Sequence, residues 1–183
     1  KRIIPTVSKQ LEAILDNLGM SHARFQIQNN ITEQYYKNGK DVLSFLFSAN
    51  KGGQFGELKK VASGGELSRI MLAIKKVMSE NSQLPTIIFD EIDSGVSGEI
   101  SNKMAHIMSQ MSQQMQVITI THLPQIAAKG NQHYKVYKEE VNNTTTTNLK
   151  QLSEDERIVE IAEMLSGKNI SDSALTHARE LLN

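Results

Sequence analysis

The stretch from Thr86 to Ser97, TIIFDEIDSGVS, constrains the fold of this chain more than any other. It begins with three bulky apolar residues, Ile87 to Phe89, and then places two carboxylates side by side, Asp90 and Glu91. An apolar run of this kind, bounded by a proline and by acids, predicts a buried strand of a parallel sheet. Ligands of open α/β sheets bind beyond the carboxyl ends of such strands. The two acids are therefore expected where an α/β protein performs its chemistry.

Asp90 and Glu91 together provide the two carboxylates that phosphoryl transfer requires. One would hold Mg²⁺, directly or through water, and the other would orient or deprotonate the attacking water. The alternative is a pair of solvated acids that open a loop after a core strand. A motif this short fits both interpretations.

A second motif, Ser63-Gly64-Gly65-Glu66, precedes a predicted helix. Ser63 and Glu66 have the spacing of a capping box. The two glycines allow a ligand to approach the backbone closely, and a helix N-terminus offers free N–H groups and the positive end of the dipole. The motif therefore predicts a phosphate clamp at the start of a core-facing helix. The apolar residues of that helix recur with the 3.6-residue period, at Leu67, Ile70, Met71, Ile74, Val77 and Met78.

A third motif is the strand predicted over residues 116–121, which ends at His122. The carboxyl ends of parallel strands meet at one edge, so His122 is expected beside Asp90 and Glu91. There its imidazole can donate to a phosphate oxygen. Residues 100–115 predict a helix with a methionine-rich stripe, which we expect to pack on the sheet rather than form a partner groove.

The remaining segments predict structural elements. Apolar residues between Ile4 and Leu18 recur at steps of 3, 4, 3 and 4, which fits either the end of a coiled coil or an ordinary amphipathic helix. Residues 23–28 and 42–47 predict an antiparallel pair of strands, and residues 133–138 and 146–149 predict two more. Two C-terminal helices follow. The chain starts at Lys1 directly within a patterned segment, so we expect it to be a piece of a longer protein.

Composition excludes several classes of protein. The 20 Lys and Arg residues balance the 20 Asp and Glu residues, so no overall positive charge indicates nucleic-acid binding. The chain has no cysteine, which excludes disulfides and thiolate metal sites. No apolar run approaches the roughly 20 residues that a membrane-spanning helix needs.

The order of the three motifs resembles the second half of an ABC-type ATPase, in which they would be the signature motif, the Walker B strand and the switch histidine. The strings VASGGELSRIMLAIK, FDEIDSGVSG and THLPQIAAKG are similar to SMC-like ATPases of bacterial recombinational double-strand-break repair. The resemblance implies an α/β fold, the C-terminal lobe of an ABC/SMC-type P-loop ATPase head, with a mainly parallel sheet flanked by helices. Residues 1–19 would be a coiled-coil remnant and residues 20–183 the lobe.

The resemblance also implies a role for each matched residue, with ATP and Mg²⁺ as cofactors. Asp90 would hold the Mg²⁺ shell, Glu91 would activate water, and His122 would contact the γ-phosphate. Two further sets of residues would act between heads. These are the signature residues Ser63, Gly64, Gly65 and Glu66, which would clamp ATP bound to the opposite head, and the dimer-seam residues Asp93, Ser94 and Gly95.

The chain departs from the family pattern in one main respect, because it contains no G-x-x-x-x-G-K-[ST] loop. In the family this loop lies in an N-terminal lobe beyond a long coiled coil. We therefore expect an ATPase in the parent protein and an inactive chain when it is alone. The implied partners are its own N-terminal lobe, a second ATP-bound head and DNA, in the bacterial cytoplasm at the nucleoid and away from membranes. Ser97 stands near the place where the family carries an aspartate.

Two alternatives stay open. One is a lobe of another SMC-like or transporter ATPase, although Glu91 is followed by Ile92 rather than proline, and Glu66 stands where transporters usually carry glutamine. The other is a non-catalytic interaction module that uses the methionine stripe or the first helix to bind a partner.

Overall fold

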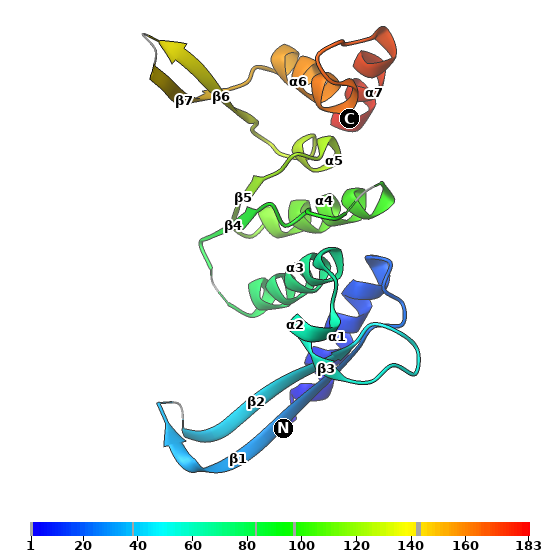
Figure 1. The fold of residues 1–183 in the computed structure, drawn as a ribbon, viewed down its shortest axis with the longest axis vertical. Coiled ribbons are helices and arrows are strands. Elements are labelled where there is room, and N and C mark those ends of the chain that lie inside the picture. Colours follow the sequence, from blue (N-terminus) through cyan, green and yellow to red (C-terminus); the bar gives the residue numbers. More distant parts are fainter. Residues whose placement is uncertain (1, 38, 83, 97, 142–143) are drawn as a thin grey trace.

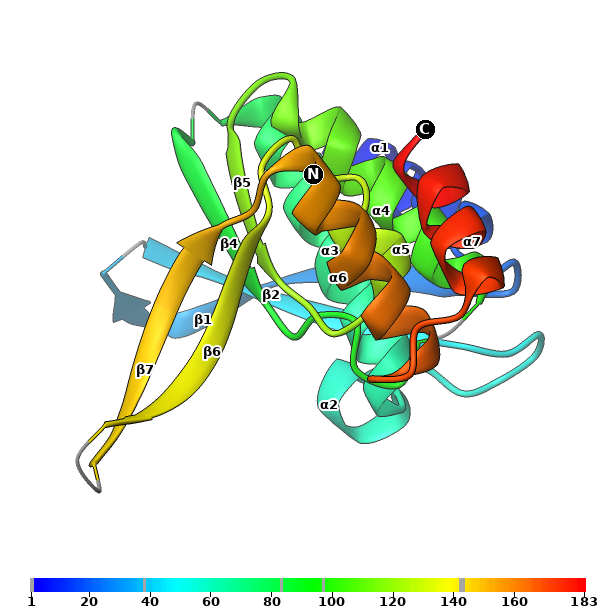
Figure 2. The same cartoon turned by 90° about the horizontal axis from the view of Figure 1, so that it is seen from above.

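The computed structural model describes residues 2–37, 39–82, 84–96, 98–141 and 144–183. Its elements are stacked along the long axis roughly in chain order, from the N-terminal strands to the C-terminal helices (Figure 1). Viewed along that axis, the longer helices gather on one side and the strands on the other (Figure 2). Over the described residues, none of the helices is both long and apolar enough to cross a membrane. The elements in order are α1 (Ile4–Asn17), β1 (Arg24–Tyr36), β2 (Gly39–Ser48), β3 (Gly56–Glu57), α2 (Leu58–Val61), α3 (Gly64–Asn81), β4 (Thr86–Asp90), α4 (Glu99–Ser112), β5 (Gln116–Ile120), α5 (Pro124–Ala127), β6 (Tyr134–Val141), β7 (Thr144–Gln151), α6 (Glu154–Ser166) and α7 (Asp172–Leu182).

Helix α1 packs on the lobe with one apolar face. Leu11 and Leu15 are buried against α3 and β1, and the Glu12 carboxylate accepts a hydrogen bond from the Phe25 amide at 2.9 Å. Leu15 lies outside the 3-4 repeat seen in the sequence, yet it is fully buried. Within this chain α1 therefore behaves as an amphipathic helix of the main core. The antiparallel pair predicted next to it is confirmed as β1 and β2, which are both longer than the sequence pattern indicated.

Helix α3 lies between α1 and α4, and this position changes which of its residues are buried. Leu72 and Ala73, outside the predicted stripe, are fully buried, whereas Met71 and Met78 within it are exposed. The difference has a simple cause. A helix with neighbours on two sides buries a wider arc than the single stripe that its periodicity indicates.

Strands β4 and β5 form the parallel pair at the centre of the molecule, with Ile88 opposite Ile118. Residues Ile87 and Phe89 point into the core, but Ile88, Ile118 and Ile120 are exposed. The pair is therefore covered on one face only, whereas the unbroken apolar run had predicted burial on both faces.

The α/β lobe is confirmed, but its strands are mostly antiparallel. The sheets β1-β2-β3 and β6-β7 are antiparallel, and only β4-β5 is parallel in the part of the chain that the structure describes. The methionine stripe of α4 packs into the core as expected, and this removes it as a partner-binding groove. The buried methionines are Met104, Met108 and Met111 of α4 and Met115 just beyond its end.

Helices α6 and α7 pack around a second, smaller apolar cluster. Arg157 of α6 is buried, and its Nη2 donates to the Gly130 carbonyl at 2.7 Å while its Nη1 pairs with Glu154 at 3.2 Å. The guanidinium thus ties α6 to the segment that follows α5. The buried residues of the cluster are Ala128, Ile161, Ala162, Ala174 and Ala178.

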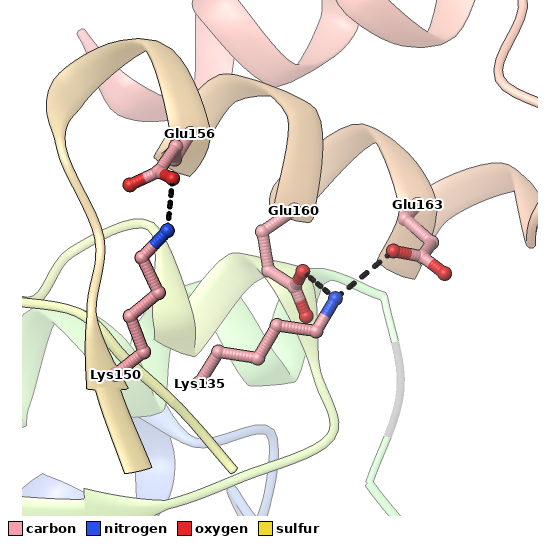
Figure 3. A network of polar contacts seen from close by, with 5 residues as sticks. All are labelled: Lys135, Lys150, Glu156, Glu160 and Glu163. Carbon is pink, nitrogen blue, oxygen red and sulfur yellow. Dashed lines mark hydrogen bonds and ion pairs between the residues drawn. The ribbon is translucent and has the colours of Figure 1, made fainter. Parts of the chain in front are cut away.

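Lysines fasten the β6-β7 hairpin to α6 (Figure 3). Lys135 of β6 pairs with Glu160 and also with Glu163, the latter at 3.1 Å. Lys150 of β7 pairs with Glu156 in the first turn of α6. The hairpin is therefore attached to α6 by ion pairs, whereas α6 and α7 are held together by the small apolar cluster.

Candidate functional site

Asp90, Glu91 and His122 lie at one edge of the parallel pair. Asp90 is the last residue of β4 and stands opposite Ile120, the last residue of β5. The Glu91 amide continues this ladder by donating to the Ile120 carbonyl at 3.1 Å. Asp90, Glu91 and His122 are all exposed. The parallel register thus brings the three predicted residues to the same open edge.

The backbone turns sharply at Glu91. Its φ of +46° is the only positive value found for a non-glycine residue among the described residues. A positive φ is uncommon for residues with a Cβ, and such positions are frequent at functional sites. The Ser94 amide donates to the Glu91 carbonyl at 3.1 Å and closes the turn. The backbone of Glu91 is thereby fixed just beyond the end of β4.

Asp93 lies inside this turn and is completely buried. Its Oδ2 accepts a hydrogen bond from the Thr121 hydroxyl, and its Oδ1 lies 3.9 Å from Nδ1 of His122. The side chain of His122 itself is 64% exposed. A buried carboxylate thus stands directly behind the predicted switch histidine.

The signature residues occupy the first turn of α3. The amide and the hydroxyl of Ser63 both donate to Oε2 of Glu66, at 2.8 and 2.7 Å. These hydrogen bonds, with a smaller contribution from the charge of Arg69, lower the pKa of Glu66 from its ordinary value. Ser63 and Gly64 are exposed. The capping box predicted from the sequence is therefore present, and it leaves the first turn open to solvent.

The signature turn contacts the loop after β4 through two glycines. A Cβ placed on Gly65 would lie 2.6 Å from the Gly95 carbonyl oxygen, so the two backbones are in direct contact. Gly95 has a φ of +74°, which favours glycine. The two predicted sets of residues, the signature and the loop after β4, are thus joined into one surface.

The dimer-seam residues do not share one environment. Ser94 and Gly95 are exposed, but Asp93 is buried and bonded within the lobe. In this chain its side chain therefore faces inward, and its predicted place at a dimer seam stays a prediction. Ser97, which stands near the family's aspartate, lies outside the described residues.

The sequence patterns missed two features of the site. One is Thr121, whose hydroxyl bonds to Asp93, and whose position next to His122 was the only signal available. The other is the contact between Gly65 and Gly95, which joins segments 30 residues apart. No group of three or more His, Asp and Glu side chains is placed to hold a metal ion by itself in the described ranges.

The fold of this chain is similar to that of solved SMC head domains. None of the protein-family models compared with the chain matches it. The Smc head domain with coiled coil and joint from Pyrococcus yayanosii superposes with a TM-score of 0.66 at 18% identity, over 90% of this chain and 30% of that one. A structure from a study of ATP-driven dimerization and DNA-stimulated activation of SMC ATPases has a TM-score of 0.59 at 18% identity, over 90% and 94% of the two chains. The fold is therefore that of part of an SMC head domain.

Sequence similarity identifies the family more narrowly. The chain is 43% identical to DNA repair protein RecN of Deinococcus radiodurans over 172 residues, or 94% of this chain and 30% of that protein. It is 40% identical to RecN of Haemophilus influenzae over 92% of its length and 30% of that protein's. Over 81% of its length it is 45% identical to RecN of Bacillus subtilis, of which it covers 26%. The chain belongs to the RecN family of bacterial DNA repair proteins, and it spans about 30% of the length of the curated relatives it matches.

Proposed function

We propose that this chain is the C-terminal head lobe of an SMC-like ATPase that acts in recombinational double-strand-break repair, with ATP joining two heads. The single observation that carries the proposal is the shared edge at which Asp90, Glu91 and His122 stand beyond β4 and β5. In this proposal residues 1–19 end a coiled coil and residues 20–183 form the lobe. DNA is the partner of the full-length protein, in the bacterial cytoplasm.

The residues at the edge fit the needs of phosphoryl transfer. Asp90 offers an exposed carboxylate, and Mg²⁺ is commonly bound through one or two carboxylates together with substrate phosphates. Bound there, Mg²⁺ would neutralise charge on the phosphate oxygens. A single well-placed carboxylate is sufficient for this role, so the residues present fit the ion.

Glu91 is the residue that we assign to the attacking water. Its backbone is fixed by two hydrogen bonds, one from its amide to the Ile120 carbonyl and one from the Ser94 amide to its own carbonyl, so its side chain starts from a defined place at the edge. A carboxylate at this place can orient water and accept its proton. His122 stands at the end of the neighbouring strand, where its imidazole can donate to an oxygen of the γ-phosphate.

The first turn of α3 is assigned to the ATP of the opposite head. Ser63 and Gly64 are exposed, and the N-terminus of an 18-residue helix carries a partial positive charge and N–H groups without intrahelical partners. Such an end stabilises a phosphate without any cation from this lobe. Ser94 and Gly95 lie beside it, in contact through Gly65, and we place them at the dimer seam.

The N-terminal lobe with the lysine-bearing phosphate loop is the further partner that the proposal requires. The exposed face of β4 and β5 supports this, because Ile88, Ile118 and Ile120 are 62%, 42% and 52% exposed. Parallel sheets are normally covered on both faces. A second lobe packed on this face would complete both the sheet and the nucleotide site.

The decisive experiment measures ATP turnover after mixing this chain with the N-terminal lobe of its parent. We expect turnover only in the mixture, because neither part holds all the catalytic groups. Glu91→Gln should lower turnover at least about 100-fold, the usual contribution of a general base, while ATP-bound dimers accumulate. Glu33→Gln, an exposed change on β1 away from the edge, is the matched control. A Glu91→Gln mixture that turns over ATP at the parental rate would contradict the proposal.

A further inference from the structure

Asp93 is the most completely buried charged side chain among the described residues. Burying a carboxylate is costly unless its oxygens are paired. Oδ2 accepts the hydrogen bond from Thr121, but Oδ1 has no hydrogen-bond partner within the described part of the chain. The nearest ionisable group to Oδ1 is the His122 ring, whose Nδ1 is 3.9 Å away.

Thr121 fixes the direction in which Asp93 points. Its hydroxyl oxygen accepts a hydrogen bond from the Leu123 amide at 2.9 Å, and its single proton is donated to Asp93. The loop after β4 and the loop after β5 are thus joined by a buried polar link directly beneath His122. Two apolar side chains in place of Asp93 and Thr121 would fill the same space without the cost of burying a charge.

We propose that Asp93 is a positioning residue for His122, an inference that rests on the proposed ATPase function. The Asp93 Oδ1 atom accepts a hydrogen bond from Nδ1–H of the ring and so turns Nε2 outward, toward the open edge that Asp90 and Glu91 share. The present 3.9 Å separation is longer than a hydrogen bond. Even at this distance the negative charge of the carboxylate favours a proton on Nδ1, the ring nitrogen that lies nearest to it, so the effect is expected in the chain alone.

This arrangement defines how the ring would meet the nucleotide. With Asp93 behind it, His122 donates from Nδ1 to the carboxylate and turns Nε2 to the nucleotide, and once Nε2 also carries a proton it donates to the γ-phosphate oxygen. Donation from both nitrogens is the hydrogen-bonding pattern of the protonated imidazole. Asp93 thus acts through His122 without touching the nucleotide.

The first test uses this chain alone and needs no turnover. Nitrogen NMR of the chain labelled at histidine, at a pH where the ring is neutral, reports which ring nitrogen of His122 carries the proton. We expect the Nδ1–H form to be enriched over that of His22, an exposed histidine that serves as the internal reference. Asp93→Asn should remove the enrichment, and Asp41→Asn, on exposed β2, should keep it.

A second variant separates positioning from folding. The double substitution Asp93→Leu with Thr121→Val replaces the buried polar link by apolar groups of similar volume, so the chain should stay folded. We expect it to lose the Nδ1–H enrichment of His122 as fully as Asp93→Asn does. The inference would be overturned if, in the parent chain, the proton of His122 were distributed between the two ring nitrogens as it is in His22. It would also be overturned if neither variant changed that distribution in His122.

The third measurement connects the link to catalysis. In the mixture with the N-terminal lobe, Asp93→Asn should lower turnover about 10-fold or more, the size of effect seen when the partners that orient metal-bound histidines are lost. Added to His122→Gln it should lower turnover no further, because it acts only through that ring. Additive losses would contradict the inference. If the parental mixture itself shows no turnover, the proposed function fails, and the NMR result still decides the role of Asp93.

Discussion

Two helices of this lobe begin with the same capping pattern but differ in what they leave open. In α3 the Ser63 amide donates to Glu66 at 2.8 Å, and in α6 the Ser153 amide donates to Glu156 at 3.0 Å. The two residues enclosed by each box are different. They are Gly64 and Gly65 in α3, and Glu154 and Asp155 in α6.

The enclosed residues decide how the positive end of each helix dipole is used. Helix α6 carries three acidic residues in its first turn, and Lys150 pairs with one of them, Glu156 (Figure 3). Its N-terminus is therefore neutralised by the chain's own carboxylates. Helix α3 has only Glu66 there, and a Cβ on Gly64 would meet no atom within 4 Å. The shared box stabilises a helix, and the glycines make one of the two ends available to an anion.

The largest expected effect is the difference in stability between alanine substitutions at the two glycines of α3. Gly65→Ala places a Cβ 2.6 Å from the Gly95 carbonyl oxygen, a backbone atom, so the loop must move. We expect a loss of about 1–3 kcal/mol in the free energy of unfolding, the usual cost of overpacking, together with a loss of turnover in the two-lobe mixture. Chemical denaturation and ATP turnover measure the two effects.

Gly64→Ala is the matched control for this prediction. Its Cβ enters open space and its φ is not in the left-handed region, so folding should be unaffected. Turnover should still fall, because the methyl group lies where the opposite head's ATP is proposed to bind. Equal stability of the Gly64→Ala and Gly65→Ala chains would show that the contact with Gly95 is unimportant.

The next effect compares the two capping serines directly. Ser63→Ala and Ser153→Ala should each cost about 1 kcal/mol in unfolding free energy, because each removes a side-chain cap. Only Ser63→Ala should also reduce ATP turnover and ATP-dependent head association in the mixture. Thermal unfolding and turnover of the two variants, prepared side by side, measure this difference. If Ser153→Ala impaired turnover as strongly, the distinction between a structural cap and a binding cap would fail.

The sequence predicted the parts of this comparison that depend on neighbouring residues. The start of α3, the strand that ends at Asp90 and the strand before His122 follow from local periodicity and capping chemistry, which act within a few residues. The order of these motifs was also sufficient to indicate the family. The antiparallel pair of β1 and β2 was predictable for the same reason.

What the sequence did not predict depends on contacts between distant segments. The burial of Asp93 depends on the turn at Glu91 and on Thr121, which comes from the next strand. The open face of β4 and β5 was also missed, because an apolar run looks the same whether its second face is covered by this chain or by another. Likewise, the burial of Leu15 follows from packing on two neighbours rather than from a repeat.

The smallest expected effect is the response of the two caps to acid. In the folded chain Lys150, followed by the Ser153 amide, lowers the pKa of Glu156 to about 2 from an ordinary value of 4.5. Hydrogen bonds from Ser63 lower the pKa of Glu66. A lowered folded-state pKa means that each glutamate stabilises the fold fully above its ordinary value and loses that contribution as the pH falls below it. Glu156→Gln and Glu66→Gln should therefore matter at pH 7 and much less near pH 2.

Salt distinguishes the two glutamates, because their causes differ. The Glu156 shift comes mainly from an exposed ion pair, which added salt screens, whereas the Glu66 shift comes mainly from hydrogen bonds to Ser63. We expect high salt at pH 7 to shrink the destabilisation caused by Glu156→Gln and to leave that of Glu66→Gln nearly unchanged, as thermal unfolding midpoints would show. Lys150→Met removes the ion pair of Glu156, so in that variant high salt should no longer change the destabilisation caused by Glu156→Gln. The same variant should leave the destabilisation caused by Glu66→Gln as it is. If both caps responded equally to salt, the start of α3 would be neutralised by charge as that of α6 is, and its assignment as the anion-binding end would lose its physical basis.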